Sequence, residues 1–560
     1  MKLILSVILT FLSLSIMGNN KTSKFDYSSK WSEIDKLMDK PLLKDAQKKV
    51  DEIRVTAKKE NDELNILKCE IYDFAIDFGC EYDITAGLNA TADNYNYAGA
   101  SLPIIRVKQR RITNREEGED IIISHYKKAS ELKDAFKSPV EKACCELFMA
   151  KMVNEFIDVM GRYPGAISTV KKESGKQFTA EDFREMSFEN LRDVVRTHVD
   201  KIVKNKETLL STSSEKYNSL FVKNDAISDE YKEVHPSVFD AMLPSLMSFY
   251  YNDIFDIEFT KSIFQPIIRV QKDLLKKDFL NSVFADVINY HNSKKEYSAA
   301  LSAELSRLQL LSLHWSKTQD NENIEALDNL IKQYDGKTPC IVNAVVKKQE
   351  IMCRALERRN NGYYSPDDLK DIESFPTLII NEAEKYKKKY PKHTGIKELD
   401  KNIKWLKNVE VNGSAKRACF GKGKDVEIKV SYANIDMLYA EIYRVEMTPV
   451  EIEKNNDREE SVKTKLVTKK EFRLSPSNYI FKKDTVLNIG NDLDYGKYLI
   501  YFSDKKNEIN KDNYITINIS DLSLFDVTTT GDKRAIFVVD GETGHPTNGA
   551  TVERYTIRGY

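Results

Sequence analysis

The spacing of apolar residues changes once along this chain, and this change limits the fold more than any other feature. From about residue 25 to residue 407, apolar residues recur every three or four positions, which is the period of an amphipathic helix. From residue 408 onward they alternate every second position, as in half-buried strands. A chain of 560 residues has room for several domains of about 150 residues each. We therefore predict a multidomain protein with an all-α helical repeat or bundle region followed by an all-β region.

Three apolar stripes show the helical period at the start of this region. They consist of Trp31, Ile34 and Met38, then Leu42, Ala46, Val50, Ile53 and Ala57, then Leu64, Leu67, Ile71 and Ala75. Farther along, Ser138, Pro139 and Glu141 predict a helix start, as cap, first residue and capping partner. Helices with short connections resemble a tetratricopeptide-like solenoid, but no strict repeat of roughly 34 residues is present, so an irregular bundle stays open. Residues 87–103 interrupt the pattern and predict an exposed loop.

The β-region contains enough alternating segments for one sandwich domain over residues 408–520. Residues 425–432 and 437–446 alternate strongly and are joined by a short turn, so we expect them to pair as an antiparallel hairpin. The highly charged residues 448–471 predict a solvated loop or an edge hairpin. Further strands are expected at residues 485–489, 495–503 and 514–519.

The last residues, 521–560, predict the start of a second β-domain. Residues 535–539 form one expected strand, several glycines and Pro546 make turns, and residues 550–557 form the expected return strand. Two or three strands cannot bury a core of their own. We therefore expect this second domain to be truncated in the chain.

Residues 1–18 have the layout of a secretory signal peptide. Lys2 precedes an apolar run over residues 3–17, and Gly18 precedes a polar stretch. A buried N-terminal helix is the alternative. Because no Cys follows the run, this site offers no acceptor for lipoprotein attachment, and no other segment is uniformly apolar. We expect a protein exported to the periplasm, the cell envelope or the extracellular space, with no transmembrane span.

Charge and cysteine content point to no special ligand. Lys and Arg number 86 against 87 Asp and Glu, a net charge of -1, so no global attraction to nucleic acid is expected. A disulfide between Cys69 and Cys80 is conceivable in an oxidising compartment, while most thiols are expected to be buried. No CxxC pair or zinc-ligand spacing occurs among the cysteines, which are Cys69, Cys80, Cys144, Cys145, Cys340, Cys353 and Cys419.

Motifs for enzyme chemistry are absent from the sequence. It contains no GxSxG, HExxH, GxxxxGK[ST] or GxGxxG, and the glycine run at 419–425 predicts a basic turn. His291 and His314 fall on separate expected helices and predict capping or packing groups rather than a metal pair. The acidic pairs Asp367-Asp368 and Glu459-Glu460 predict solvated surface. We expect no catalytic residue, no metal site, no cofactor and no enzyme activity.

A pattern near the end of the chain resembles a known family. Residues 540–552 fit D-x-x-T-G-x-P-x-x-G-A-x-V, a loop found in macroglobulin-type sandwiches. Residues 235–253 are similar to a helical segment of the same family, with His235 in place of a common Arg and Ala241 in place of a common aromatic residue. These two patterns occur in a chain with the order signal peptide, helical region and sandwich. In this combination the chain resembles the N-terminal region of Bacteroidetes-type bacterial alpha-2-macroglobulin family proteins.

The resemblance implies an endopeptidase inhibitor that is cleaved in a bait region, changes conformation and traps the protease. The Cys-Gly-Glu-Gln thioester sequence of many members is absent here, so the bait and any thioester are expected beyond Tyr560. The implied parts are a signal peptide (1–18), a helical region (25–407), a macroglobulin-like sandwich (408–520) and a truncated second one (521–560). Proteases, and other cell-envelope proteins, are the expected partners.

Two other functions fit the same sequence. The first is a non-catalytic cell-envelope scaffold, in which helical repeat and sandwich bind protein or glycan partners. The second is an accessory region that supports a hydrolase domain located elsewhere.

Overall fold

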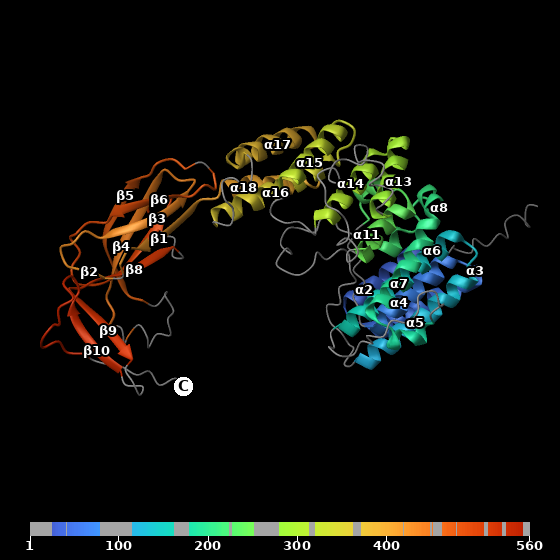
Figure 1. The fold of residues 1–560 in the computed structure, drawn as a ribbon, viewed down its shortest axis with the longest axis horizontal. Helices are drawn as coiled ribbons and strands as arrows, with labels where there is room; N and C mark the ends of the chain where they lie inside the picture. Colours follow the sequence, from blue (N-terminus) through green and yellow to red (C-terminus); the bar gives the residue numbers. More distant parts are fainter. Residues whose placement is uncertain are drawn as a thin grey trace, which may run out of the picture. The chain divides into compact units, whose positions relative to one another are not determined.

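A computed structural model describes residues 25–40, 42–78, 115–161, 179–222, 227–250, 279–312, 320–361, 371–417, 419–448, 451, 462–477, 479–508, 513–528 and 534–552. The chain forms two compact units, Met1–Lys348 and Gln349–Tyr560, which divide within one helix. Figure 1 shows helices in the first unit, and helices followed by strands in the second. The predicted fold class, a helical region followed by a β-sandwich and further strands, is confirmed.

The first three helices bury ten of the twelve residues of the three predicted stripes, and Met38 is half-buried. They are α2 (Tyr27–Asp39), α3 (Leu43–Glu60) and α4 (Glu63–Phe78). The Asp26 side chain caps α2 by accepting a hydrogen bond from the Ser29 amide, and Asn61 ends α3 in the left-handed conformation. Leu42 is exposed, because it precedes α3 instead of lying on its buried face. The stripe residues that are buried are Trp31, Ile34, Ala46, Val50, Ile53, Ala57, Leu64, Leu67, Ile71 and Ala75.

The remaining helices of the first unit form a bundle with a shared core. Helices α4, α5, α6, α7, α11 and α13 all contribute to one apolar cluster, and α11 contacts α6 although several helices separate them in the sequence. The elements are α5 (Arg115–Ala135), α6 (Pro139–Gly161), η2 (Ala180–Glu185), α7 (Phe188–Lys204), α8 (Lys206–Ser211), α9 (Asn218–Phe221), α10 (Asp229–Val234), α11 (Val238–Tyr250), α13 (Phe279–Lys294), α14 (Tyr297–Ser312), α15 (Asp320–Tyr334) and α16 (Ile341–Asn360).

The predicted start of α6 is confirmed. Pro139 is its first residue, and the Ser138 hydroxyl accepts a hydrogen bond from the Val140 amide while it donates to the Glu141 carboxylate. None of the described helices combines the length and hydropathy of a membrane span. The expected loop at 87–103 and the expected signal peptide lie outside the described residues.

The second unit begins with the end of α16 and continues through η8 (Ile372–Ser374), α17 (Phe375–Lys389) and α18 (Ile396–Leu406). A sandwich follows, with one sheet in the order β1-β3-β6 and another in the order β2-β8-β7-β4-β5. Its core is continuous and apolar. The strands are β1 (Glu410–Ala415), β2 (Cys419–Phe420), β3 (Glu427–Ala433), β4 (Met437–Val445), β5 (Thr464–Arg473), β6 (Lys483–Asn488), β7 (Gly496–Ser503) and β8 (Tyr514–Ile519).

The predicted hairpin between residues 425–432 and 437–446 is wrong, although both strands exist. β3 pairs with β1 and β6, whereas β4 pairs with β5 and β7 in the other sheet. Asn434 makes the crossing in a left-handed conformation, and its side-chain amide donates to the carbonyls of Leu406 and Asn408, both at 2.8 Å. Crossing between sheets buries the apolar faces of both strands in one core.

The hairpin that does form joins β4 to β5. β5 is an edge strand of the larger sheet and comes from the charged segment, so the edge-hairpin alternative is confirmed for residues 464–473. Its side chains are exposed or half-buried.

Two further strands, β9 (Leu522–Thr528) and β10 (Arg534–Asp540), pair with each other in a separate antiparallel sheet, which we call the ribbon. The predicted strand at 535–539 is therefore confirmed. Its partner differs from the prediction, because β10 pairs with the preceding β9. Residues 550–552 form no strand, and 553–557 lie outside the described residues.

Candidate functional site

The loop after β10 is shaped by Asp540, the first residue of the recognised pattern. Its Oδ1 accepts hydrogen bonds from the Thr543 amide and hydroxyl, both at 2.8 Å, and from the Glu542 amide at 3.1 Å. These hydrogen bonds, the one from the Thr543 amide first, lower the pKa of Asp540. Gly544 has a φ of 71°, which favours glycine, and donates to the Asp540 carbonyl at 2.9 Å. The Asp, Thr and Gly of the pattern thus serve one tight turn.

The same loop folds back along β10. The Asp540 amide donates to the His545 carbonyl at 2.8 Å, and the Thr547 amide donates to the Val538 carbonyl at 3.0 Å. Pro546 forms an isolated antiparallel bridge with Val539. The loop is therefore held by backbone hydrogen bonds, and its pattern is explained by conformation without a bound ligand.

The ribbon exposes apolar side chains on both faces. Phe525 lies opposite Phe537 in the register, and both rings are about half exposed, at 56% and 55%. Because side chains alternate along a strand, Leu522, Leu524 and Ile536 lie on the other face, where all three are exposed. An isolated pair of strands is marginally stable in water. The ribbon is therefore a two-stranded sheet whose two apolar faces both remain exposed.

A cluster of polar contacts joins the ribbon to the sandwich at Asp521. Its carboxylate accepts from the Lys422 amide at 2.9 Å and from the Tyr495 hydroxyl, and its carbonyl accepts from the Gly541 amide at 2.8 Å. The hydrogen bond from Tyr495 is the main cause of a lowered pKa of Asp521. Lys424 adds an ion pair with Glu542 at 2.9 Å. The expected basic turn at 419–425 is present and serves as part of this junction.

His291, one of the two histidines considered for a metal pair, is a buried packing group, as expected. Its Nε2 lies 2.9 Å from Asp240 and its Nδ1 lies 2.7 Å from Glu296. Burial lowers the pKa of His291, but the hydrogen bonds to Asp240 and then Glu296 outweigh it and raise the pKa above its ordinary value. The two carboxylates favour the protonated ring, which can donate from both nitrogens. Its expected partner His314 lies outside the described residues, as do Asp367, Asp368, Glu459 and Glu460.

His125 and His198 are buried as well, and their carboxylate partners were not predicted from the sequence. His125 lies between Glu70, at 2.6 Å, and Asp77, at 3.0 Å, and these carboxylates raise its pKa against the opposing effect of burial. His198 instead contacts Glu146 through Nδ1 and the Tyr126 hydroxyl at 2.8 Å through Nε2.

Burial lowers the pKa of His198, and its one carboxylate partner, Glu146, does not offset this effect. A neutral ring can accept the hydrogen bond from the Tyr126 hydroxyl. In the described part of the chain, the three rings are hydrogen-bonded to carboxylates and, at His198, to the Tyr126 hydroxyl, so they act as structural clamps between helices.

Four of the described cysteines, Cys69, Cys144, Cys145 and Cys340, are buried, as expected for most thiols of the chain. Cys69 is a free, buried thiol and Cys80 lies outside the described residues, so the conceivable pairing of these two gains no support. Burial raises the pKa of Cys69 to about 12 and the pKa of Cys340 to about 11. Cys144 and Cys145 are buried in the bundle core.

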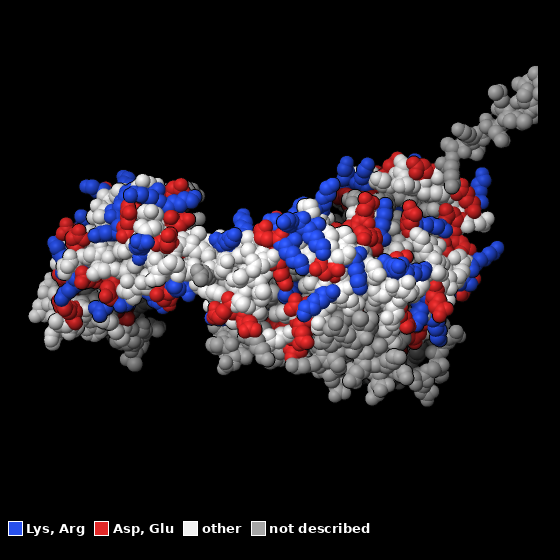
Figure 2. All heavy atoms as spheres, turned by 90° about the horizontal axis from the view of Figure 1, so that it is seen from above, with Lys and Arg blue, Asp and Glu red and all other residues white. Residues whose placement is uncertain are grey.

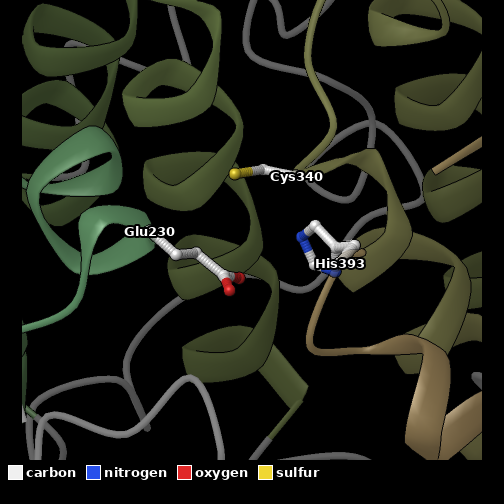
Figure 3. Close-up of side chains that lie close together, drawn as sticks. All are labelled: Glu230, Cys340 and His393. Atoms are coloured by element: carbon white, nitrogen blue, oxygen red, sulfur yellow. The ribbon is translucent and has the colours of Figure 1, made fainter. Parts of the chain in front are cut away.

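Figure 3 labels Glu230, Cys340 and His393, which carry metal-binding atoms. In the first unit, Glu230 lies on α10 and accepts from the Asn343 side chain at 3.3 Å, while the Cys340 amide donates to the Thr338 hydroxyl at 3.0 Å. In the second unit, the Nδ1 of His393 accepts from the Gly395 amide at 3.1 Å. Within either unit, the described residues hold no group of three such donors, the usual minimum for a zinc site.

Charged side chains are mixed over much of the surface. Figure 2 shows basic and acidic residues interspersed on the face seen from above. A partner attracted by charge must therefore recognise a local group of residues.

The chain has limited similarity to known proteins. No family model matches it, and no curated protein matches it. It is similar to a crystal structure of native alpha-2-macroglobulin from Escherichia coli spanning domains MG0-NIE-MG1, with 18% identity and a TM-score of 0.20, over 24% of this chain and 47% of that one. A second structure of the same protein, spanning NIE-MG1, gives 16% identity and a TM-score of 0.19, over 25% of this chain and 74% of that one. The chain thus spans less than half of the first of these structures, and likeness at this level carries no conclusion about activity.

Proposed function

We propose that this chain is the N-terminal arm of an exported alpha-2-macroglobulin-like protein that inhibits endopeptidases by trapping them. The observation that carries the proposal is the ribbon. It follows a closed sandwich, is apolar on both faces, and ends in the loop with the D-x-x-T-G-x-P-x-x-G-A-x-V pattern. These are the features expected where one macroglobulin-type sandwich is succeeded by another.

In this proposal the chain has a framework role. Its helical unit and sandwich bury their own cores, and the Asp521 junction holds the ribbon beside the sandwich. The bait region and any thioester would lie beyond Tyr560, and export would use the apolar run at 3–17. Proteases would be bound by the complete protein.

The test uses the complete gene product and trypsin. We expect one early cleavage, followed by retention of active trypsin that hydrolyses a small chromogenic peptide but not casein, since a trapped protease is shielded from large substrates. Trypsin with a blocked nucleophile is the control and should not be retained. Progressive degradation, with casein hydrolysed as fast as the small peptide, would contradict the proposal.

The coding sequence after Tyr560 separates the proposal from its alternatives. Further sandwiches with a bait-like insert support trapping. A stop codon supports a scaffold at the cell envelope, and a hydrolase domain supports an accessory role.

A further inference from the structure

Residues 385–407 form the most one-sidedly charged stretch of the second unit. They contain nine lysines against Glu398 and Asp400, a local net charge of +7 in a chain whose total is -1. The lysines are Lys385, Lys387, Lys388, Lys389, Lys392, Lys397, Lys401, Lys404 and Lys407.

Helix α18 separates these charges from its apolar residues. Leu399 and Leu406 are buried on one side, whereas Lys397, Lys401 and Lys404 follow helical spacing on the other. Helix α17 packs beside α18, and an ion pair of 2.6 Å between Lys387 and Asp400 joins them. The end of α17, the following turn and α18 therefore present their lysines to solvent together.

Most of this charge is not compensated. Lys387 pairs with Asp400 and Lys401 pairs with Glu398. Five other lysines are exposed and have no acidic partner among the described residues. We call these five the lysine patch: Lys388, Lys392, Lys397, Lys404 and Lys407.

Helix stability explains only part of the lysine patch. The dipole of α18 favours Lys404 in its last turn and Lys407 at its C-cap. Cations at the end of α17 are favoured by the helix dipole, which accounts for Lys388. The dipole of α18 disfavours Lys397, which lies in the first turn of this helix, and Lys392 lies in the turn between the helices. Like charges held close together repel, so the cluster costs stability and requires another reason.

The side chains of the patch suit an extended anionic surface as a ligand better than a single anionic group. No arginine occurs between Arg359 and Arg417, although arginine is the residue suited to bidentate recognition of one phosphate or carboxylate. Lysines act as point charges and suit the diffuse attraction of an anionic bilayer, to which each contributes independently. Half-buried Trp405, beside Lys404, and half-buried Tyr390 supply rings of the kind that settle at a bilayer interface.

We propose that the lysine patch docks this protein on bilayers rich in anionic phospholipid. The inference relies on the predicted export, which would bring the chain to a membrane surface, and does not depend on protease trapping. It also refines the expectation from net charge, because a total near zero conceals a strongly basic local surface.

The test is flotation of the complete chain with vesicles of phosphatidylcholine alone or mixed with phosphatidylglycerol. We expect binding only to the mixed vesicles, and weaker binding as salt shortens the Debye length from about 10 Å at 0.1 M to about 3 Å at 1 M. Replacing all five patch lysines by glutamine should lower the partition coefficient at least about tenfold.

A matched variant removes the same charge elsewhere. Lys→Gln changes at five exposed sandwich lysines, Lys463, Lys465, Lys483, Lys497 and Lys505, should leave binding nearly unchanged. Circular dichroism checks that both variants fold. Absence of binding to the mixed vesicles, an equal loss in both variants, or binding to a soluble sulfated polysaccharide but not to vesicles would each overturn the proposal.

Discussion

The sandwich and the ribbon are built from the same kind of sequence, yet only the sandwich is closed. Both are rich in apolar residues, and their strands pair antiparallel except for the parallel pair of β2 and β8 in the sandwich. The ring of Phe502 on β7 is fully buried by the facing sheet, whereas the ring of Phe537 on β10 is 55% exposed. Apolar residues on a strand therefore provide a face that can be buried, and a second layer is needed to bury it.

The helical unit is closed in the same sense, and it also satisfies its charges. His291 and His125 are each buried between two carboxylates. The ribbon differs from both, because its apolar side chains remain in solvent.

The largest expected effect compares the two phenylalanines directly. Phe502→Ala should lower the free energy of unfolding of the second unit by about 3–5 kcal/mol, because it leaves a cavity in a closed core. Phe537→Ala should change it by less than about 1 kcal/mol, because its ring is already half in water. Urea unfolding followed by the fluorescence of Trp405, in variants that lack the other two tryptophans, measures both. Equal losses would show that the ribbon is as closed as the sandwich.

Replacing His291 removes one partner of a buried ion pair. We therefore expect a pH-dependent loss of about 3 kcal/mol in the free energy of unfolding of the helical unit. The folded-state pKa of His291 is raised above its unfolded value near 6.5. Its stabilisation is therefore fully present below pH 6.5 and is lost as pH rises through the folded pKa. His291→Gln should destabilise the helical unit most at low pH, with a smaller difference at alkaline pH. A difference that grows with pH would contradict the imidazolium assignment.

A smaller effect tests how tightly the sandwich closes. A Cβ atom added to Gly413 on β1 would lie 2.4 Å from Cε2 of Phe502. Gly413→Ala should therefore cost about 1–3 kcal/mol through overpacking, and combining it with Phe502→Ala should remove most of that cost. Denaturant unfolding of the single and double variants measures the coupling. Additive losses would show that the ring and the glycine do not constrain each other.

The sequence predicted which segments form helices and strands better than it predicted their partners. Stripes such as Leu64, Leu67 and Ile71 identified buried faces because the helical period is local. The pairing of β3 and β4 was wrong because alternation does not specify which sheet a strand joins.

The histidine clamps could not be found by spacing. His125 and Glu70 are 55 residues apart, and only the packing of α4 against α5 brings them together. The loop at Asp540 was recognised as a pattern, and the structure supplies its reason in the hydrogen bonds to Thr543 and the positive φ of Gly544.

The ribbon is an open sheet attached to closed domains. Hydrogen exchange of the 1–560 chain, followed by mass spectrometry, tests it by comparing peptides from β9 and β10 with peptides from β7. We expect the ribbon amides to exchange orders of magnitude faster than those of β7, because an uncovered pair of strands opens at little cost in free energy. Protection of β9 and β10 equal to that of β7 would contradict it.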